Sequence, residues 1–325
     1  MTSRYRYFWR RFMHINFNYK LVPHIKLNKT QQNGTLPCTV GFSVLTLLGF
    51  EKKMNAEDEL ILTIKHCILF VQRGEFDKAE QLLHVALKQA QQISHQLGVT
   101  YIYDVMANLA LEREQYDKAK RLFIAVTQRI MADGATEDDL RVIHISVKLA
   151  RISHMMKEYS TAQLGFEWCI DKLNNAYKKD PSEDNTKLLA MAEDWYGRLF
   201  LDNNKTEIAY QYMKKAYERM KDLVDIDQEH LIIQLNDLGT VCDLLGKADE
   251  SIEYYSNAID LGKKFPDMHD LGAMYVNLGR AYIKKNMLDI ARKSCGQAWK
   301  LGVTTKNNDV KREAELCIQE IRGMS

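Results

Sequence analysis

The sequence predicts an all-α protein: a right-handed solenoid of about six stacked helix pairs, closed by a C-terminal capping helix. Three observations lead to this fold class. The 325 residues include only 4 prolines, while Ala, Leu, Lys, Glu and Gln are abundant, which favours helices. A ten-residue pattern recurs every 40 to 47 residues, as it does in stacked arrays. Small residues also recur in three columns at fixed offsets within that period.

The chain begins with a basic segment, residues 1–35. Residues 1–50 hold seven Lys or Arg and no acidic residue, so they carry +7 while the remainder carries −5. Basic residues interleaved with aromatic and apolar ones are typical of a mitochondrial transit peptide. A disordered basic tail is the alternative. Because the body is mildly acidic, we expect no nucleic-acid partner.

Residues 36–50 carry no charge and are largely apolar. As a helix they would extend about 22 Å, against about 30 Å of bilayer hydrocarbon. We interpret them as a candidate membrane anchor, and membrane association of the protein is the expectation. A secretory signal core is the rival interpretation.

The repeat array is predicted over residues 57–303, where six segments align without gaps. Two antiparallel helices approach closely only where small side chains face each other, and larger neighbours fill the flanking space. The first column of small residues is Ala79, Ala119, Ala162, Ala209, Ser251 and Ala291, and the column twelve residues earlier is Cys67, Ala107, Ala150, Gly197, Gly239 and Gly279. This is the tetratricopeptide pattern with units longer than the usual one. A generic helical bundle would not repeat these offsets six times.

The helix pairs follow from this pattern and from the helix breakers between them. Residues 304–325 form the predicted capping helix and tail, because an array needs a polar end. The predicted pairs are 57–73/75–96, 99–113/115–132, 138–157/159–178, 184–202/205–224, 228–245/247–263 and 269–285/287–301.

The six cysteines show no zinc-binding spacing, and a chain of this length can bury a core without disulfides. We therefore predict free, mostly packed thiols, although the even number leaves disulfides open. The sequence also lacks phosphate-binding, zinc-protease and serine-hydrolase motifs. It predicts a protein that is not an enzyme and that has no cofactor, metal or small-molecule substrate.

A helical solenoid offers a concave surface formed by the first helix of each pair. One column of that surface contains three arginines, which could bind carboxylates or backbone carbonyls of a peptide. The candidate groove residues are Arg151, Arg198, Arg280, Asp104, Asn108, Asp194 and Asn236. The alternative is that these arginines pair with the acidic residues inside the array.

Four segments carry a more specific resemblance: residues 74–90, 99–123, 145–152 and 165–173. They resemble the mitochondrial tetratricopeptide repeat protein 19 family, in an invertebrate form, and the similarity covers roughly residues 57–320. The resemblance implies a protein of the inner membrane that binds respiratory complex III. It implies support of the assembly and maintenance of that electron-transport complex by helping to remove N-terminal fragments of the Rieske iron–sulfur subunit.

The resemblance carries over no catalytic residue, and any proteolysis would belong to a partner. Whether the array faces the matrix or the intermembrane space stays open. The alternative function is a cytosolic cargo or signalling adaptor that resembles kinesin light chains.

Overall fold

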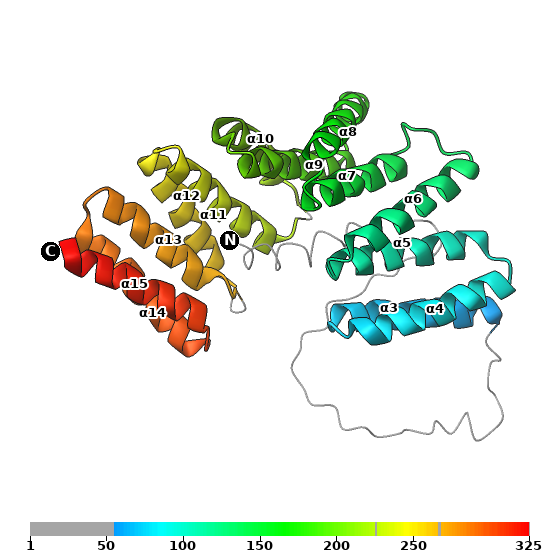
Figure 1. The fold of residues 1–325 in the computed structure, drawn as a ribbon, viewed down its shortest axis with the longest axis horizontal. Helices are drawn as coiled ribbons and strands as arrows, with labels where there is room; N and C mark the ends of the chain where they lie inside the picture. The colour runs from blue at the N-terminus through cyan, green and yellow to red at the C-terminus, as the bar shows by residue number, and fades with distance from the viewer. Residues whose placement is uncertain (1–54, 225, 266–267, 325) are drawn as a thin grey trace, which may run out of the picture. The chain divides into compact units, whose positions relative to one another are not determined.

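A computed structural model describes residues 55–224, 226–265 and 268–324. These residues form thirteen α-helices and no strand, which confirms the predicted all-α helical-repeat fold (Figure 1). They divide into two compact units, residues 55–136 and residues 137–324. The predicted targeting segment and the uncharged apolar segment lie outside the described residues.

The first unit contains two antiparallel helix pairs. Each pair joins two helices of 17 residues through a turn of three residues. The pairs are α3 (Ala56–Gln72) with α4 (Phe76–Gln92), and α5 (Gln96–Glu112) with α6 (Tyr116–Ala132).

The second unit contains four further pairs and a final helix, α15 (Asn308–Met324). The side chain of Asp139 accepts a hydrogen bond from the backbone N–H of Arg141 at the start of the first pair, and Asp227 caps the third pair in the same way. The pairs are α7 (Leu140–Met155) with α8 (Tyr159–Lys179), α9 (Glu183–Asp202) with α10 (Thr206–Met220), α11 (Gln228–Leu244) with α12 (Ala248–Gly262), and α13 (Leu271–Lys284) with α14 (Leu288–Thr304).

The turn inside every pair has the same backbone geometry. One residue, five positions before the first small column, has a positive φ between 57° and 73° in all six pairs. This left-handed residue ends the first helix and reverses the chain. The six residues are Gly74, Glu114, Lys157, Asn204, Gly246 and Asn286.

The small residues lie where the two helices of a pair meet. All six residues of the first column are fully buried. A Cβ added at Gly197 would lie 2.7 Å from Met213 Cγ, and one added at Gly239 would lie 2.7 Å from the Tyr255 ring. At Gly279 the added atom would meet the Cys295 sulfur. Close packing therefore requires small residues at these points.

The cysteines differ in part from the expectation of free thiols. Cys67, Cys169 and Cys242 are free and buried, as predicted. Cys295 and Cys317 instead form a disulfide between α14 and α15, with a Cα–Cα distance of 6.1 Å. The sequence prediction missed this bond because it was based on the whole chain, which is long enough to bury a core without disulfides. The capping helix, however, contributes only four buried residues of its own.

The largest differences in helix boundaries are at the ends of α4 and α10, each of which ends four residues before its predicted end. The second helix of the first pair was predicted to reach residue 96, but it ends at Gln92. Ser94 takes a positive φ of 55°, and the His95 ring accepts a hydrogen bond from the N–H of Gly98 at 2.9 Å. His95 therefore caps α5 without the Gly or Pro that marks other turns.

Candidate functional site

Polar side chains of α7, α9, α11 and α13 contact one another in the second unit. We call this set the polar seam, and it contains two of the three arginines of the predicted groove column. Its members are Arg151, His154, Asp194, Arg198, Asp202, Asn236, Asp237 and Asn277.

Arg198 holds the centre of the seam. Its Nε donates to Asp194 Oδ2 at 2.8 Å within α9, and its Nη2 donates to Asp237 Oδ2 on α11 at 2.9 Å. Burial disfavours the charged guanidinium, but the two carboxylates outweigh it, so the pKa of Arg198 is raised. Burial also raises the pKa of Asp237 despite the neighbouring arginine. One cation is thus shared by two acids.

Arg151 belongs to a second chain of contacts. Its Nη1 donates to His154 Nδ1 at 2.7 Å, and His154 Nε2 lies 2.9 Å from Asp202 Oδ2 on α9. Burial lowers the pKa of His154, which favours the neutral ring that accepts from the arginine and donates to the carboxylate. Burial would raise the pKa of Asp202, but the hydrogen bond from His154 outweighs it and the pKa is lowered.

The remaining groove candidates of the second unit lie towards α13. Asn277 Nδ2 donates to Asn236 Oδ1 at 3.0 Å, which links α13 to α11. Arg280 Nη2 donates to Glu313 of α15 at 2.8 Å, and its side chain is 38% exposed. Arg280 is therefore the groove arginine that a partner could reach most directly.

The two candidates of the first unit are neighbours on α5. Asn108 Nδ2 donates to the backbone oxygen of Asp104 at 2.8 Å, one helical turn earlier. Both side chains are half-buried. This contact lies within one helix and does not by itself form a cleft.

The three arginines do not form one exposed row. Arg151 and Arg198 are only 2% and 4% exposed, and both bind side chains of the array. For Arg198, the alternative of pairing with acids inside the array describes the structure, because one partner is the candidate residue Asp194. The expectation of an accessible arginine wall is corrected to this extent, because both buried guanidinium groups already hold partners inside the array.

Sequence reasoning missed four members of the seam: His154, Asp202, Asp237 and Asn277. A signal for two of them was present in the spacing. Asp237 lies 39 residues after Arg198, and Asn277 lies 41 residues after Asn236, about one repeat in each case. Polar residues one period apart on first helices are therefore candidates for contact between neighbouring pairs.

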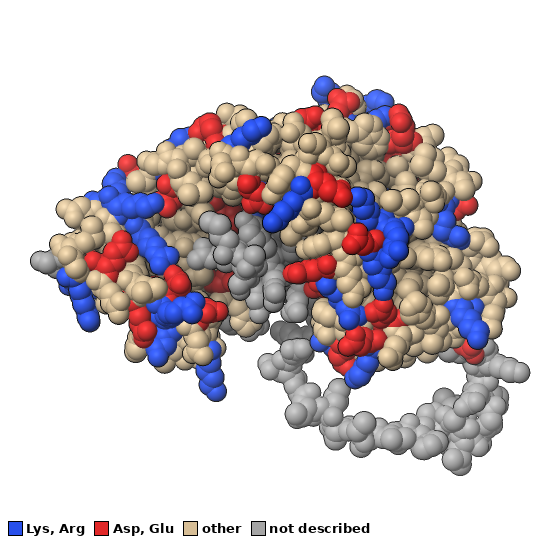
Figure 2. All heavy atoms as spheres, viewed as in Figure 1, with Lys and Arg blue, Asp and Glu red and all other residues tan. Residues whose placement is uncertain are grey.

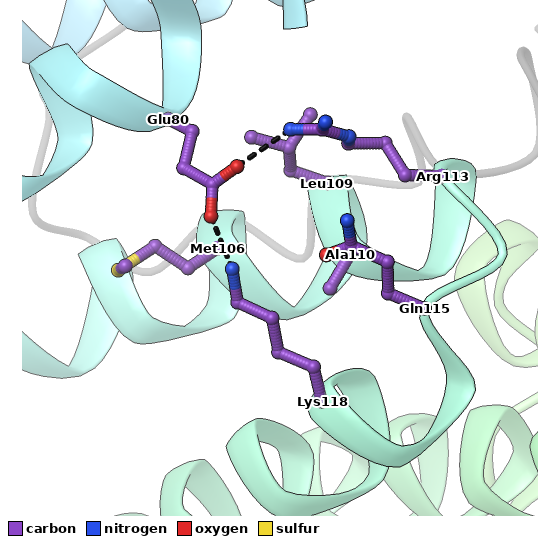
Figure 3. A pocket seen from close by; sticks show the side chains of 7 residues that line it. All are labelled: Glu80, Met106, Leu109, Ala110, Arg113, Gln115 and Lys118. Atoms are coloured by element: carbon purple, nitrogen blue, oxygen red, sulfur yellow. Dashed lines mark hydrogen bonds and ion pairs between the residues drawn. The ribbon is translucent and has the colours of Figure 1, made fainter. Parts of the chain in front are cut away.

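A second polar junction lies in the first unit, around Glu80 of α4 (Figure 3). Glu80 Oε2 accepts from Arg113 Nη1 at 2.5 Å, and its other oxygen accepts from Lys118. The hydrogen bond from Lys118, followed by its charge and that of Arg113, lowers the pKa of Glu80. Met106, Leu109, Ala110 and Gln115 line the same shallow pocket, which has no interior space for a ligand.

The junction recurs at the same repeat positions in the second unit. Glu80 follows a residue of the first small column, and Lys118 precedes the next residue of that column. Tyr210 and Glu250 stand at the same two positions, and the Tyr210 hydroxyl donates to Glu250 Oε2 at 2.7 Å. Arg113 binds Asp77 at 2.9 Å, and Lys285 binds Asp249 from the corresponding positions. These polar contacts join successive pairs and are structural.

The described surface carries both signs of charge. Figure 2 shows Lys and Arg beside Asp and Glu over the visible face of each unit. Among the described residues, no group of His, Cys, Asp and Glu has the arrangement of a metal site. Within the same residues, no helix is both long and apolar enough to span a membrane.

Solved structures with similar folds are helical-repeat proteins of low sequence identity. BtubC from P. vanneervenii gives a TM-score of 0.55 at 15% identity, covering 76% of this chain and 92% of that one. A kinesin light chain with TPR-like repeats from Podosopora anserina gives 0.50 at 15% identity, covering 62% and 94%. These likenesses show the fold alone.

No protein-family model matches the chain, but curated relatives do. The Drosophila melanogaster tetratricopeptide repeat protein 19 homolog, mitochondrial, is 35% identical over 273 residues, which cover 84% of this chain and 74% of that protein. The mitochondrial tetratricopeptide repeat protein 19 of Homo sapiens is 32% identical, with coverage of 66% and 60%. The higher identity to the insect protein agrees with an invertebrate form. The chain belongs to the mitochondrial tetratricopeptide repeat protein 19 family.

Proposed function

We propose that this protein is a noncatalytic scaffold of the mitochondrial inner membrane that supports assembly and maintenance of respiratory complex III. In this role it aids removal of N-terminal fragments of the Rieske iron–sulfur subunit. The observation that carries the proposal is the family relationship, which extends over 84% of the chain.

The fold suits such a role physically. Stacked helix pairs present a long surface on which many modest contacts add up to useful affinity. The polar groups of the seam are largely engaged with each other, and the Glu80 pocket is too small for a substrate. The protein then acts by holding other proteins, and peptide-bond cleavage belongs to a partner.

We further propose that the partly exposed groove candidates of the second unit contribute to partner binding. Arg280 and Asn236 are the candidates there, because both are partly exposed in the second unit. The Arg280→Ala/Asn236→Ala variant should capture less complex III from mitochondrial extracts than the parent chain. A control is Lys178→Ala/Lys179→Ala, which changes two exposed residues outside the seam. Equal capture by the two variants would remove these residues from the interface.

The function is tested by crosslinking in intact mitochondria followed by mass spectrometry. We expect crosslinks from the array to subunits of complex III, including the Rieske protein. Depletion should cause Rieske N-terminal fragments to accumulate and should lower ubiquinol–cytochrome c reductase activity. Normal fragment levels after depletion, with no crosslink to the complex, would reject the proposal. The compartment of the crosslinked neighbours also identifies the side of the membrane.

The cytosolic adaptor is not favoured. Its support is a fold likeness to a kinesin light chain at 15% identity, whereas the relatives of higher identity carry mitochondrial names. A tagged chain that stays in the cytosol with an uncleaved leader would reverse this preference.

A further inference from the structure

The first helix of the array exposes an apolar face that every later first helix buries. Leu62 and Leu69 of α3 are 42% and 38% exposed. They stand seventeen and ten residues before Ala79, which is the residue of the first small column in this pair. The residues at the same two positions in α5, α7, α9, α11 and α13 are all buried, and none exceeds 3% exposure. These ten residues are Ile102, Leu109, Ile145, Ile152, Ala192, Leu199, Gln234, Val241, Met274 and Ala281.

The contacts of α5 show what this face packs against. Ile102 and Leu109 belong to one core cluster with Leu83, Ala86 and Ala90 of α4, the second helix of the preceding pair. The two positions therefore form the surface that joins one pair to the pair before it. On α3 the same surface has no described helix in front of it.

The face of α3 retains apolar residues although it lies at the end of the array. A terminal unit is expected to have a polar outer surface, because water replaces the missing neighbour. In α3, however, Leu62 and Leu69 are seven residues apart, about two helical turns, and therefore lie on the same side of the helix. Burial of two leucines against an apolar partner is favourable, so a covered face is the more stable state.

We propose that residues 36–50 of this chain cover the Leu62–Leu69 face of α3. These residues precede α3 directly, carry no charge and are largely apolar. Residues 51–55 connect them to α3, whereas three residues suffice to connect α4 to α5. As a helix, fifteen residues would extend about 22 Å, close to the about 25 Å of a 17-residue helix such as α3.

The repeat spacing supports the same occupant. Ala79 and Ala86 are small residues of α4 that pack against the neighbouring helices, and both are fully buried. One 40-residue unit earlier, the spacing reaches Thr39 and Thr46, which are also small. This spacing is the one expected if residues 36–50 take the place that the second helix of a preceding pair would occupy. This inference is independent of the proposed function in complex III maintenance.

The proposal is tested on the full 325-residue chain by hydrogen–deuterium exchange. In the parent chain, backbone amides of residues 36–50 should be protected. The Leu62→Gln/Leu69→Gln variant should increase their exchange rate at least tenfold, with unchanged helix content by circular dichroism. The control is Val85→Gln/Ile124→Gln, which changes two exposed residues of second helices and should leave the protection unchanged. Equal exchange in the parent and the Leu62→Gln/Leu69→Gln variant would overturn the proposal.

A photo-crosslinking amino acid at position 69 identifies the occupant directly. We expect the crosslink to fall within residues 36–50 of the same chain. A crosslink to lipid, to a second copy or to another protein would overturn the assignment and name the true occupant. A mature chain in mitochondria that begins after residue 50 would also overturn it, because the covering segment would be absent.

Discussion

At the scale of single residues, the array is shaped by the turn position that recurs inside each pair. Six residues adopt a left-handed backbone there, and only two of them are glycine. A side chain in this conformation costs about 1–2 kcal/mol because Cβ approaches the following carbonyl oxygen. The sequence marks Gly74 and Gly246 as turns, but Lys157 gives no such sign. Its geometry is imposed by the two helices that it joins.

This difference predicts opposite effects for two substitutions. Lys157→Gly should raise the free energy of unfolding by about 0.5–1 kcal/mol, because glycine removes the strain but loses more chain entropy on folding. Gly74→Ala should lower it by about 1 kcal/mol, since its φ is 73°. Urea denaturation of both variants checks the prediction. A destabilised Lys157→Gly protein would contradict it.

Two glycines of α14 provide a matched test of close packing. A Cβ at Gly302 would lie 2.7 Å from the backbone nitrogen of Lys311 in α15, whereas one at Gly296 would have no neighbour within 4 Å. Gly302→Ala should therefore destabilise the protein by about 1–3 kcal/mol. Gly296→Ala should stabilise it by up to about 1 kcal/mol through helix propensity. Thermal unfolding distinguishes the two, and equal shifts in Tm would contradict this interpretation.

At the scale of helices, successive pairs are joined by polar contacts as well as by their apolar core. Glu80 of α4 binds Arg113 and Lys118, and its pKa is lowered chiefly by Lys118. A carboxyl with a lowered folded-state pKa stabilises the fold above its usual pKa of 4.5. That stabilisation is lost as the pH falls through the folded-state value.

The Glu80→Gln variant should therefore respond less to acid than the parent chain. At neutral pH we expect it to lose up to about 1 kcal/mol, the usual range for a partly exposed ion pair. From about pH 5 to about pH 3, its unfolding free energy should fall less than that of the parent. Urea titrations across this range measure both quantities. Parallel pH curves would show that Glu80 does not contribute through its charge.

The seam between α9 and α11 predicts a larger effect for one arginine than for another. Arg198→Ala would leave Asp194 and Asp237 near each other without their shared cation, which should cost about 3 kcal/mol. Arg280→Ala breaks a partly exposed pair with Glu313 and should cost less than about 1 kcal/mol. Chemical denaturation of both variants measures the difference. Similar losses would show that the seam contributes no more than a surface pair.

At the scale of the whole chain, sequence predicted the fold because its signals are local and repeated. Small residues such as Ala79 and Gly239 recur at one spacing since each pair meets the same packing constraint. The seam was harder to predict. Whether Arg198 faces solvent, binds a peptide or pairs with Asp237 depends on which side chains lie near it in three dimensions, and the local sequence pattern does not give this. The pairing of Cys295 with Cys317 was equally unreadable, since even cysteine numbers do not fix connectivity.

A repeat array should also respond locally to damage, because each unit draws its stability from itself and its immediate neighbours. Glu80→Gln should increase amide exchange in α4, α5 and α6, and Gly302→Ala should increase it in α13, α14 and α15. Each variant should leave the other region unchanged. In the double variant the two losses should add within about 0.5 kcal/mol, since the sites share no partner. Peptide-resolved hydrogen exchange of the two single variants and the double variant measures the local exchange rates, and urea denaturation measures the losses in unfolding free energy. Increased exchange in both regions from either single substitution would instead show that the chain unfolds as one cooperative block.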